Sequence, residues 1–211
     1  MSVNEDSTVQ LATQPAVAPS PGIADPAPLG LGAFALTTFL LSAANAGWMG
    51  SATGAAFLGY AFAYGGLCQL LAGMWEFRNK NVFGATAFST YGGFWIGLAL
   101  WVLLVAPGKG NTALMLTHDK GWILLAFAIF NTYMLILSTQ VNLAVFGVFL
   151  TLEITEIVLF IAGFANNADM VKVGGVIGVI TAVVAWYTSF AGVAAGIGGK
   201  IKLPVGKPLV S

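Results

Sequence analysis

Residues 29–49 read LGLGAFALTTFLLSAANAGWM and contain no charged side chain. About 20 consecutive apolar residues make a helix long enough to cross the hydrocarbon core of a bilayer, which is about 30 Å thick. Because further apolar stretches of similar length fill most of the chain, the sequence predicts an all-α membrane protein with six transmembrane helices. The other five stretches are residues 52–77, 82–106, 121–139, 143–165 and 171–197.

The composition indicates a chain whose surroundings are largely lipid. Hydrophobic residues make up 58% of the chain and charged residues only 8%, whereas an ordinary soluble domain is about 25% charged. The formal net charge is zero and the Lys and Arg residues are scattered, so we expect no nucleic-acid partner. The single cysteine, Cys68, can form neither an intrachain disulfide nor a thiolate metal site within one chain. We therefore expect no metal and no cofactor.

Two tails flank the predicted transmembrane domain. Residues 1–24 are rich in Pro, Ala, Ser and Thr and show no periodicity, which predicts a disordered N-terminal tail. Residues 25–199 contain the six spans, and residues 200–211 form a short C-terminal tail.

Loop cations predict the orientation of the bundle, because Lys and Arg prefer the cytoplasmic side of a membrane. With six spans both termini lie on one side, and that side holds five cations against three on the other. We therefore expect a multi-pass protein of the plasma membrane with both termini in the cytoplasm. The five cations are Arg78, Lys80, Lys200, Lys202 and Lys207, and the three are Lys109, Lys120 and Lys172.

The first, third and fifth spans begin alike. Asp25, Asn81 and Asn142 precede them, and each is an Asx residue suited to cap a helix N-terminus. These three starts lie on the same side of the membrane, and nine or ten residues of helix rise about 15 Å, to the middle of the core. Bulky side chains at that depth could close a pore, although such residues are also common in ordinary helix packing. They are Phe34, Tyr91 and Leu152.

The segment Asp25-Pro-Ala-Pro-Leu-Gly-Leu31 resembles the signature Asn-Pro-Ala-Pro-Leu-Gly-Leu of the acetate uptake transporter family, which includes the bacterial succinate-acetate permease. Tyr64-Gly-Gly66 with Gln69 looks like the second helix of that family, and Asn81-Val-Phe-Gly84 looks like the start of its third. Leu203-Pro-Val-Gly206 extends the likeness to the C-terminal end.

This resemblance implies a homohexamer in the membrane in which each protomer has its own pore for acetate, with succinate used by some members. It also implies a constriction formed by a Phe, a Tyr and a Leu, which match Phe34, Tyr91 and Leu152. Transport then follows either an anion-channel or a proton-coupled mechanism, and membrane lipid surrounds the assembly.

Two features concern charge. Asp25 stands where the family signature has Asn; a carboxylate there could favour a protonated substrate or simply cap the helix. Glu153 and Glu156 lie three residues apart on one face of the fifth span. Charged residues inside membrane helices are rare, so this pair is a candidate for proton coupling. A contact between protomers or a salt bridge to a loop cation are the structural alternatives.

A small carboxylate loses water when it passes through an apolar constriction. Polar side chains on both sides of the constriction would replace that water. Each candidate could equally make a hydrogen bond to a neighbouring helix, and the amide groups at the start of the first helix could also attract an anion. The candidate substrate-binding residues are Asp25, Leu29, Thr37, Thr38, Asn45, Gln69, Thr86, Ser89, Thr90, Asn131 and Thr132.

Other classes of function are less well supported by the sequence. An intramembrane enzyme needs a nucleophile with a base, or a metal cluster, within the bundle. The only histidine, His118, falls in the connection 108–120, and Cys68 has no histidine on its helix, so we expect no enzyme. A membrane sensor or assembly protein that binds small carboxylates without transporting them is the alternative function.

Overall fold

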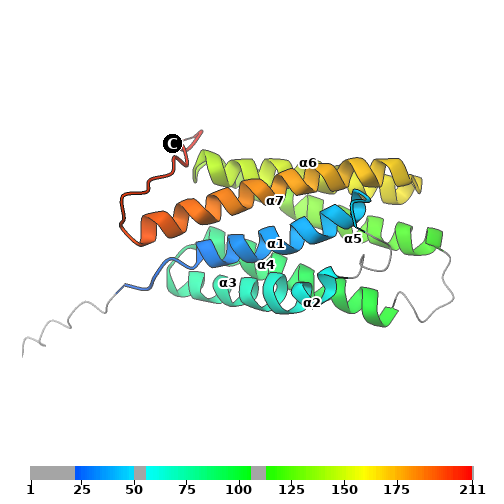
Figure 1. Ribbon diagram of the computed structural model, residues 1–211, viewed down its shortest axis with the longest axis horizontal. Helices are drawn as coiled ribbons and strands as arrows, with labels where there is room; N and C mark the ends of the chain where they lie inside the picture. The colour runs from blue at the N-terminus through cyan, green and yellow to red at the C-terminus, as the bar shows by residue number, and fades with distance from the viewer. Residues whose placement is uncertain (1–21, 50–55, 106–112, 211) are drawn as a thin grey trace, which may run out of the picture.

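The computed structural model describes residues 22–49, 56–105 and 113–210. It is all-helical, and six helices are long and apolar enough to span a membrane, which confirms the predicted fold class (Figure 1). Almost all of the predicted tail 1–24 lies outside the described residues. The helical elements are α1 (Ala27–Asn45), α2 (Phe57–Phe62), η2 (Ala63–Cys68), α3 (Gln69–Arg78), α4 (Val82–Leu100), η3 (Trp101–Val105), α5 (Ala113–Ser138), α6 (Leu143–Ala165) and α7 (Ala168–Gly196).

Two of the six spans are composite helices. The second span joins α2 to α3 through η2, a π-helical segment, and the third ends in a second π-helical segment, η3. A π segment adds a residue to the turn and often accompanies a functional site. The second span therefore runs without a break from Phe57 to Arg78.

The predicted caps are correct for two helices and shifted for the third. The Asn81 side chain accepts a hydrogen bond from the Gly84 N–H at 3.1 Å, and Asn142 caps α6 in the same way. α1 instead begins after Pro26, and Asp25 Oδ1 accepts from the Ala27 N–H at 2.9 Å. Because prolines at 26 and 28 have no N–H, Ala27 is the one early amide that Asp25 can reach.

His118 lies in a helix, not in the loop that we predicted. α5 begins at Ala113, because the apolar residues that follow contain no helix breaker before Gly121. The His118 ring packs edge-on against Phe164, with ring centroids 5.2 Å apart. The histidine therefore serves the contact between α5 and the end of α6.

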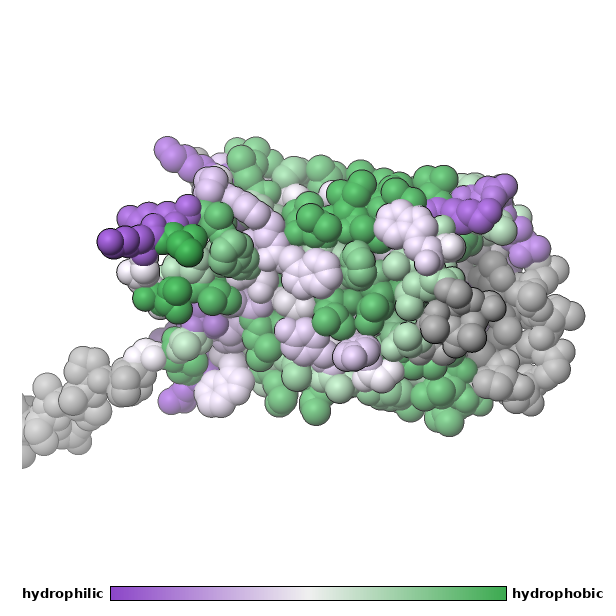
Figure 2. Space-filling model, viewed as in Figure 1, coloured by the Kyte–Doolittle hydropathy of each residue, from purple (hydrophilic) through white to green (hydrophobic). Residues whose placement is uncertain are grey.

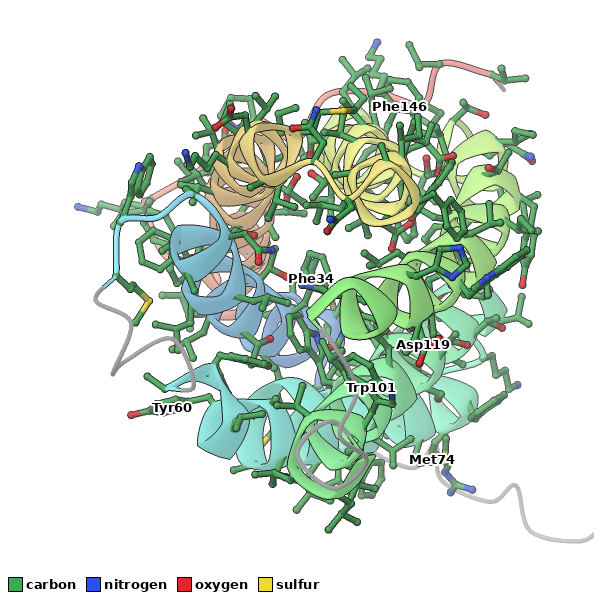
Figure 3. All side chains as sticks on the ribbon, turned by 90° about the vertical axis from the view of Figure 1, so that its right-hand side faces the viewer. Phe34, Tyr60, Met74, Trp101, Asp119 and Phe146 are labelled. Carbon is green, nitrogen blue, oxygen red and sulfur yellow. The ribbon has the colours of Figure 1, made fainter. Side chains whose placement is uncertain are left out.

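α1 lies inside the bundle and packs along α7 for most of its length, while α6 fills the space between α7 and α5 (Figure 3). Close approach of α1 and α7 depends on glycine. A Cβ on Gly175 would meet the backbone of Ser42 and Ala46, and one on Gly178 would meet the Ser42 side chain. Small residues at such contacts let membrane helices pack by van der Waals contact.

The outer surface has the polarity of a transmembrane protein. Figure 2 shows hydrophobic side chains across the middle of the face in view and hydrophilic residues gathered toward its ends. Large apolar side chains remain exposed on this belt, such as Leu71, Ile129, Ile136, Val183 and Phe190. A surface of exposed apolar side chains is stable when it contacts lipid, whereas contact with water would cost free energy.

The C-terminal segment 200–210 has no helix, yet it is bound to the ends of three helices. The Ala144 N–H donates to the Val205 carbonyl at 2.9 Å, and the Leu209 N–H donates to the Thr139 carbonyl at 2.7 Å. The Tyr187 hydroxyl donates to the Pro204 carbonyl at 2.7 Å. The segment that we predicted as a short tail thus folds back over one end of the bundle.

Candidate functional site: two cavities and an apolar neck

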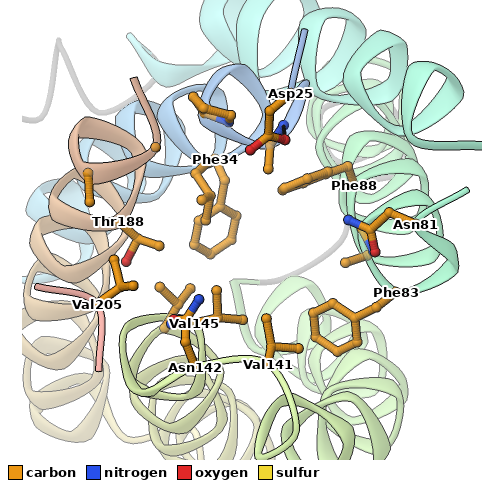
Figure 4. Close-up of a pocket in the computed structure, with 18 of the residues that line it drawn as sticks. Asp25, Phe34, Asn81, Phe83, Phe88, Val141, Asn142, Val145, Thr188 and Val205 are labelled. Atoms are coloured by element: carbon orange, nitrogen blue, oxygen red, sulfur yellow. Dashed lines mark hydrogen bonds between the residues drawn. The ribbon is translucent and has the colours of Figure 1, made fainter. Parts of the chain in front are cut away.

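A cavity of about 360 Å³ opens at the end of the bundle where α1, α4 and α6 begin (Figure 4). Its walls are mainly apolar, and the C-terminal segment contributes Leu203 and Val205. None of the residues that line it is a Lys, Arg or His. The polar lining residues are Asp25, Gln69, Glu76, Asn81, Tyr91, Asn142 and Thr188.

The inner wall of this cavity is formed by the three bulky residues that we predicted from helix depth. Phe34, Tyr91 and Leu152 all line it, all are buried, and all belong to one apolar cluster. The Phe34 and Tyr91 rings meet edge to face with centroids 5.7 Å apart, and Figure 4 shows the Phe34 ring pointing into the cavity. We call these three residues the neck.

A second cavity, of about 230 Å³, lies toward the opposite end of the bundle. Its lining includes Asn45, Trp101 and Lys120. Along α1 the order is Asp25 at the first cavity, Phe34 in the neck and Asn45 at the second cavity. An apolar neck therefore separates two spaces that each contain polar groups.

A hydrogen-bond network fastens Tyr91 to α5 and α6. The Tyr91 hydroxyl donates to Asn131 Oδ1 at 2.9 Å. Asn131 Nδ2 donates to the Phe149 carbonyl at 3.0 Å and to Glu153 Oε2 at 2.6 Å, and Thr132 Oγ1 donates to Glu153 Oε1 at 2.8 Å. Asn131 and Thr132, two of the predicted substrate-binding residues, thus hydrogen-bond within the protein and line neither cavity.

Glu156 is buried one turn beyond Leu152, and its Oε2 atom has no hydrogen-bond partner among the described residues. Its carboxyl group lies beside the Tyr91 hydroxyl and near Glu153. Within the described part of the chain the one ion pair joins Lys172 to Asp169, so no cation there pairs with Glu153 or Glu156. This leaves Glu156 as an unpaired carboxyl group at the depth of the neck.

The other predicted binding residues divide into two groups. Asp25 and Gln69 line the first cavity and Asn45 lines the second. The Thr37 hydroxyl donates to the Ala33 carbonyl within its own helix, and Leu29 is exposed. The residues of this group that line neither cavity are Leu29, Thr37, Thr38, Thr86, Ser89 and Thr90.

Glu76 is a site residue that our sequence reasoning missed. Its side chain is 0% exposed and lines the first cavity. Oε2 accepts from Asn79 Nδ2 at 3.2 Å, while Oε1 has no partner among the described residues. In the sequence Glu76 begins a polar cluster at the end of a span, a pattern typical of a helix end in water. No local feature of the sequence distinguishes Glu76 from an exposed residue at the end of a helix.

Two aligned cavities separated by a neck, within six apolar spans, define a membrane channel or transporter. The chain belongs to the GPR1/FUN34/yaaH family, whose model matches residues 8–207. This assigns the chain to the family expected from its signature residues.

Similar proteins occur in fungi and bacteria. The chain is 41% identical to accumulation of dyads protein 2 of Saccharomyces cerevisiae, over 85% of this chain and 65% of that protein. It is 39% identical to acetate permease A of Emericella nidulans, over 86% of this chain and 65% of that protein. The chain thus spans about two thirds of the length of these fungal relatives.

Bacterial relatives match nearly end to end. The succinate-acetate/proton symporter SatP of Escherichia coli is 34% identical over 88% of this chain and 96% of that protein. A solved structure of the bacterial acetate channel SatP superposes with a TM-score of 0.79 at 31% identity, covering 87% of this chain and 99% of that one. Members of the family are thus described as transporters or channels.

Proposed function

We propose that this protein carries acetate and related small monocarboxylates, with succinate as a further substrate, across a membrane through a pore in each protomer. The observation that carries the proposal is the neck of Phe34, Tyr91 and Leu152 between two cavities that each have some polar lining residues. Relatives named acetate permease and succinate-acetate/proton symporter supply the class of substrate. The proposal assigns the protein no catalytic role.

The neck would select by dehydration. An apolar constriction removes water from a passing anion, which costs several kcal/mol unless donors or a proton replace that water. Acetate has a methyl end that suits the Phe34 and Leu152 surfaces. In its protonated form it has a carboxyl O–H that can donate to the Tyr91 oxygen, because the Tyr91 proton is already donated to Asn131. No Lys or Arg lines the first cavity, so binding there would be weak enough to permit release.

We further propose that Glu156, together with Glu153, takes up a proton during transport. Glu156 is buried and has no cationic partner among the described residues, and ionisable residues inside membrane helices mark proton pathways. Proton transfer between Glu156 and the substrate beside Tyr91 would couple the two movements. Glu153 differs because Asn131 and Thr132 donate hydrogen bonds to its two carboxyl oxygens.

The test of the function is uptake of labelled acetate into liposomes that contain the purified protein, with and without an imposed pH gradient. Protein-free liposomes measure the acetic acid that crosses lipid unaided. Accumulation above that control under the gradient supports coupled transport, and rapid equilibration without the gradient supports a channel. Uptake equal to the protein-free control under both conditions would contradict the proposal.

Assembly and location are also proposals. We propose that the protein is a homohexamer in the plasma membrane. We also propose that both termini lie in the cytoplasm, because the end of the bundle that holds the first cavity carries more loop cations than the other end. These cations are Arg78, Lys80, Lys200, Lys202 and Lys207. Native mass spectrometry of the extracted protein measures the copy number, and a monomer would contradict the hexamer. Labelling of these lysines by an impermeant reagent only in broken cells would support the orientation, whereas labelling in intact cells would reverse it.

A further inference from the structure

Two buried side chains that line the first cavity, Glu76 and Gln69, each have one oxygen atom without a hydrogen-bond partner among the described residues. Glu76 is 0% exposed and Gln69 is 1% exposed, and both line the cavity. Glu76 Oε1 and Gln69 Oε1 have no hydrogen-bond partner among the described residues. A buried oxygen without a donor is costly, so both atoms are placed to accept hydrogen bonds from something that occupies the cavity.

The described surroundings of Glu76 provide space, and no Lys, Arg or His among them lines the cavity. The next helix presents Gly84 to it, and a Cβ at that position would lie 2.7 Å from Glu76 Oε1. Asn81 Nδ2 would lie 2.6 Å from the same Cβ. A side chain larger than glycine at 84 would displace the carboxyl group, so the backbone of α4 leaves room for it.

The charged residues that line the cavity, Asp25 and Glu76, are both acidic. Asp25 lies at its mouth before α1, Glu76 lies on α3, and Glu156 lies beyond the neck on α6. α4 and α7 contribute the uncharged Asn81 and Thr188. The nearby cations are Arg78, the last residue of α3, and Lys80 on the turn that follows. Both are exposed, as are the lysines of the C-terminal segment.

We propose that Glu76 is a specificity-determining residue that admits an acid by sharing one proton with it. This inference rests on the proposed transport of carboxylates. A carboxyl group and a carboxylate that share a proton form a short, strong O–H···O⁻ hydrogen bond. The proton comes from the incoming acid or from Glu76 itself, and no bond other than O–H is made or broken. A second carboxylate on the substrate stays ionised in this acidic cavity and is repelled.

Glu76 therefore favours monocarboxylic over dicarboxylic acids, and it makes transport depend on pH. The charge of Glu76 and a second carboxylate on the substrate would repel each other within the cavity. At an effective dielectric constant near 20, this repulsion is strong enough to change the selectivity for monocarboxylic over dicarboxylic acids by about tenfold. Removing the charge of Glu76 while keeping its shape should remove this selectivity. Glutamine does so, because its amide can donate directly to a carboxylate anion without a proton.

The experiment compares labelled acetate and labelled succinate exchange in liposomes that contain wild-type protein or the Glu76→Gln variant, at equal internal and external pH. In the variant we expect the succinate-to-acetate flux ratio at pH 7 to rise by about tenfold. We also compare acetate flux at two pH values. The variant should exceed the wild-type protein in acetate flux by more at pH 8 than at pH 5, because Glu76 of the wild-type protein binds its proton less often at pH 8. A purely structural role for Glu76 would lower both fluxes together and leave the ratio unchanged.

The matched control is Asp169→Asn, which also removes a carboxylate. Asp169 is exposed at the start of α7, at the opposite end of the bundle, and pairs only with the exposed Lys172. This variant should keep the wild-type flux ratio. A ratio within about twofold of wild type in a correctly inserted Glu76→Gln protein would overturn the inference, since the expected change is about tenfold.

Wild-type protein provides a second test if the variant fails to fold. Unlabelled succinate should compete with labelled acetate better at pH 5, where more of it carries a proton, than at pH 7.5. Equal competition at both pH values would overturn the inference while leaving acetate transport intact. Wild-type liposomes that exchange no acetate would overturn both the inference and the proposed function.

Discussion

Tyr91 has two roles at the residue scale, because its ring and its hydroxyl group contact different partners. The ring forms part of the neck against Phe34 and packs on Phe130 with centroids 5.5 Å apart. The hydroxyl donates to Asn131, which in turn donates to Glu153. The position of the ring therefore depends on a chain of hydrogen bonds that extends to the carboxylates of α6.

Replacing Tyr91 by Phe separates these two roles. The variant Tyr91→Phe keeps the apolar wall and leaves Asn131 Oδ1 buried without its donor, which should cost about 1–3 kcal/mol of stability. Thermal unfolding of the detergent-solubilised protein measures this as a lower melting temperature. An unchanged melting temperature would show that the hydrogen bond does not stabilise the neck. Phe130→Leu, which changes an adjoining ring and no hydrogen bond, is the control for altered packing.

Glu156 makes a second residue-scale prediction. The variant Glu156→Gln keeps the size of the side chain and removes its ability to bind and release a proton, so gradient-driven acetate accumulation should stop while downhill exchange continues. Flux into liposomes with and without a pH gradient measures both. Accumulation at the wild-type level would exclude Glu156 as the coupling group. Asp169→Asn again serves as the control for loss of an exposed carboxylate.

At the scale of elements, the contact between α1 and α7 fixes the helix that carries Phe34. Gly175 and Gly178 allow that contact because their missing side chains leave room for the backbone and side chain of Ser42 and its neighbours. α1 also begins next to Asp25, which lines the first cavity, and ends at Asn45, which lines the second. Displacement of α1 would therefore alter both cavities and the neck together.

This packing gives a prediction with a control on the same helix. Gly175→Ala forces a methyl group against the α1 backbone and should destabilise the protein by about 1–3 kcal/mol. Gly196→Ala, at the end of α7, meets nothing within 4 Å and should leave stability unchanged or slightly raised. Melting temperatures of the two variants measure the difference, and equal values would contradict the proposed role of the contact.

The elements themselves could be predicted from the sequence because long apolar stretches have few alternatives in lipid. Periodicity could not reveal the π segment at residues 63–68, which depends on how neighbouring helices pack. The helical position of His118 was missed because polar residues near a span end suggest a loop. The bound C-terminal segment was missed because its hydrogen bonds join residues distant in sequence, such as Tyr187 and Pro204.

The sequence could predict only those site residues whose position depends on depth in the membrane alone. Counts of nine or ten residues from the Asx residues locate Phe34, Tyr91 and Leu152 at about one depth, and the structure groups them in one apolar cluster. Which polar residues face the cavities depends on helix rotation, which the nearly uniform apolar character of these spans does not encode. Asn131 and Glu76 show this in opposite ways: the first hydrogen-bonds inside the bundle, and the second lines a cavity.

At the scale of the whole molecule, the chain has an apolar belt, two cavities and a neck between them. The described residues hold no group of three His, Cys, Asp or Glu side chains that could bind a metal ion. The neck residues line the first cavity, and the second cavity lies further along α1 toward the other end of the bundle. This architecture suits selective passage of a small solute, with the neck as the barrier.

The most direct test of this account is labelled-acetate flux through the triple variant Phe34→Ala, Tyr91→Ala and Leu152→Ala beside wild-type protein, in liposomes with equal protein content. If the three side chains form the barrier, their removal should raise acetate flux by about tenfold or more, since several kcal/mol of dehydration cost are relieved. Larger carboxylates should then pass as well. Unchanged flux in a correctly inserted triple variant would contradict the claim that substrate crosses the membrane through this neck.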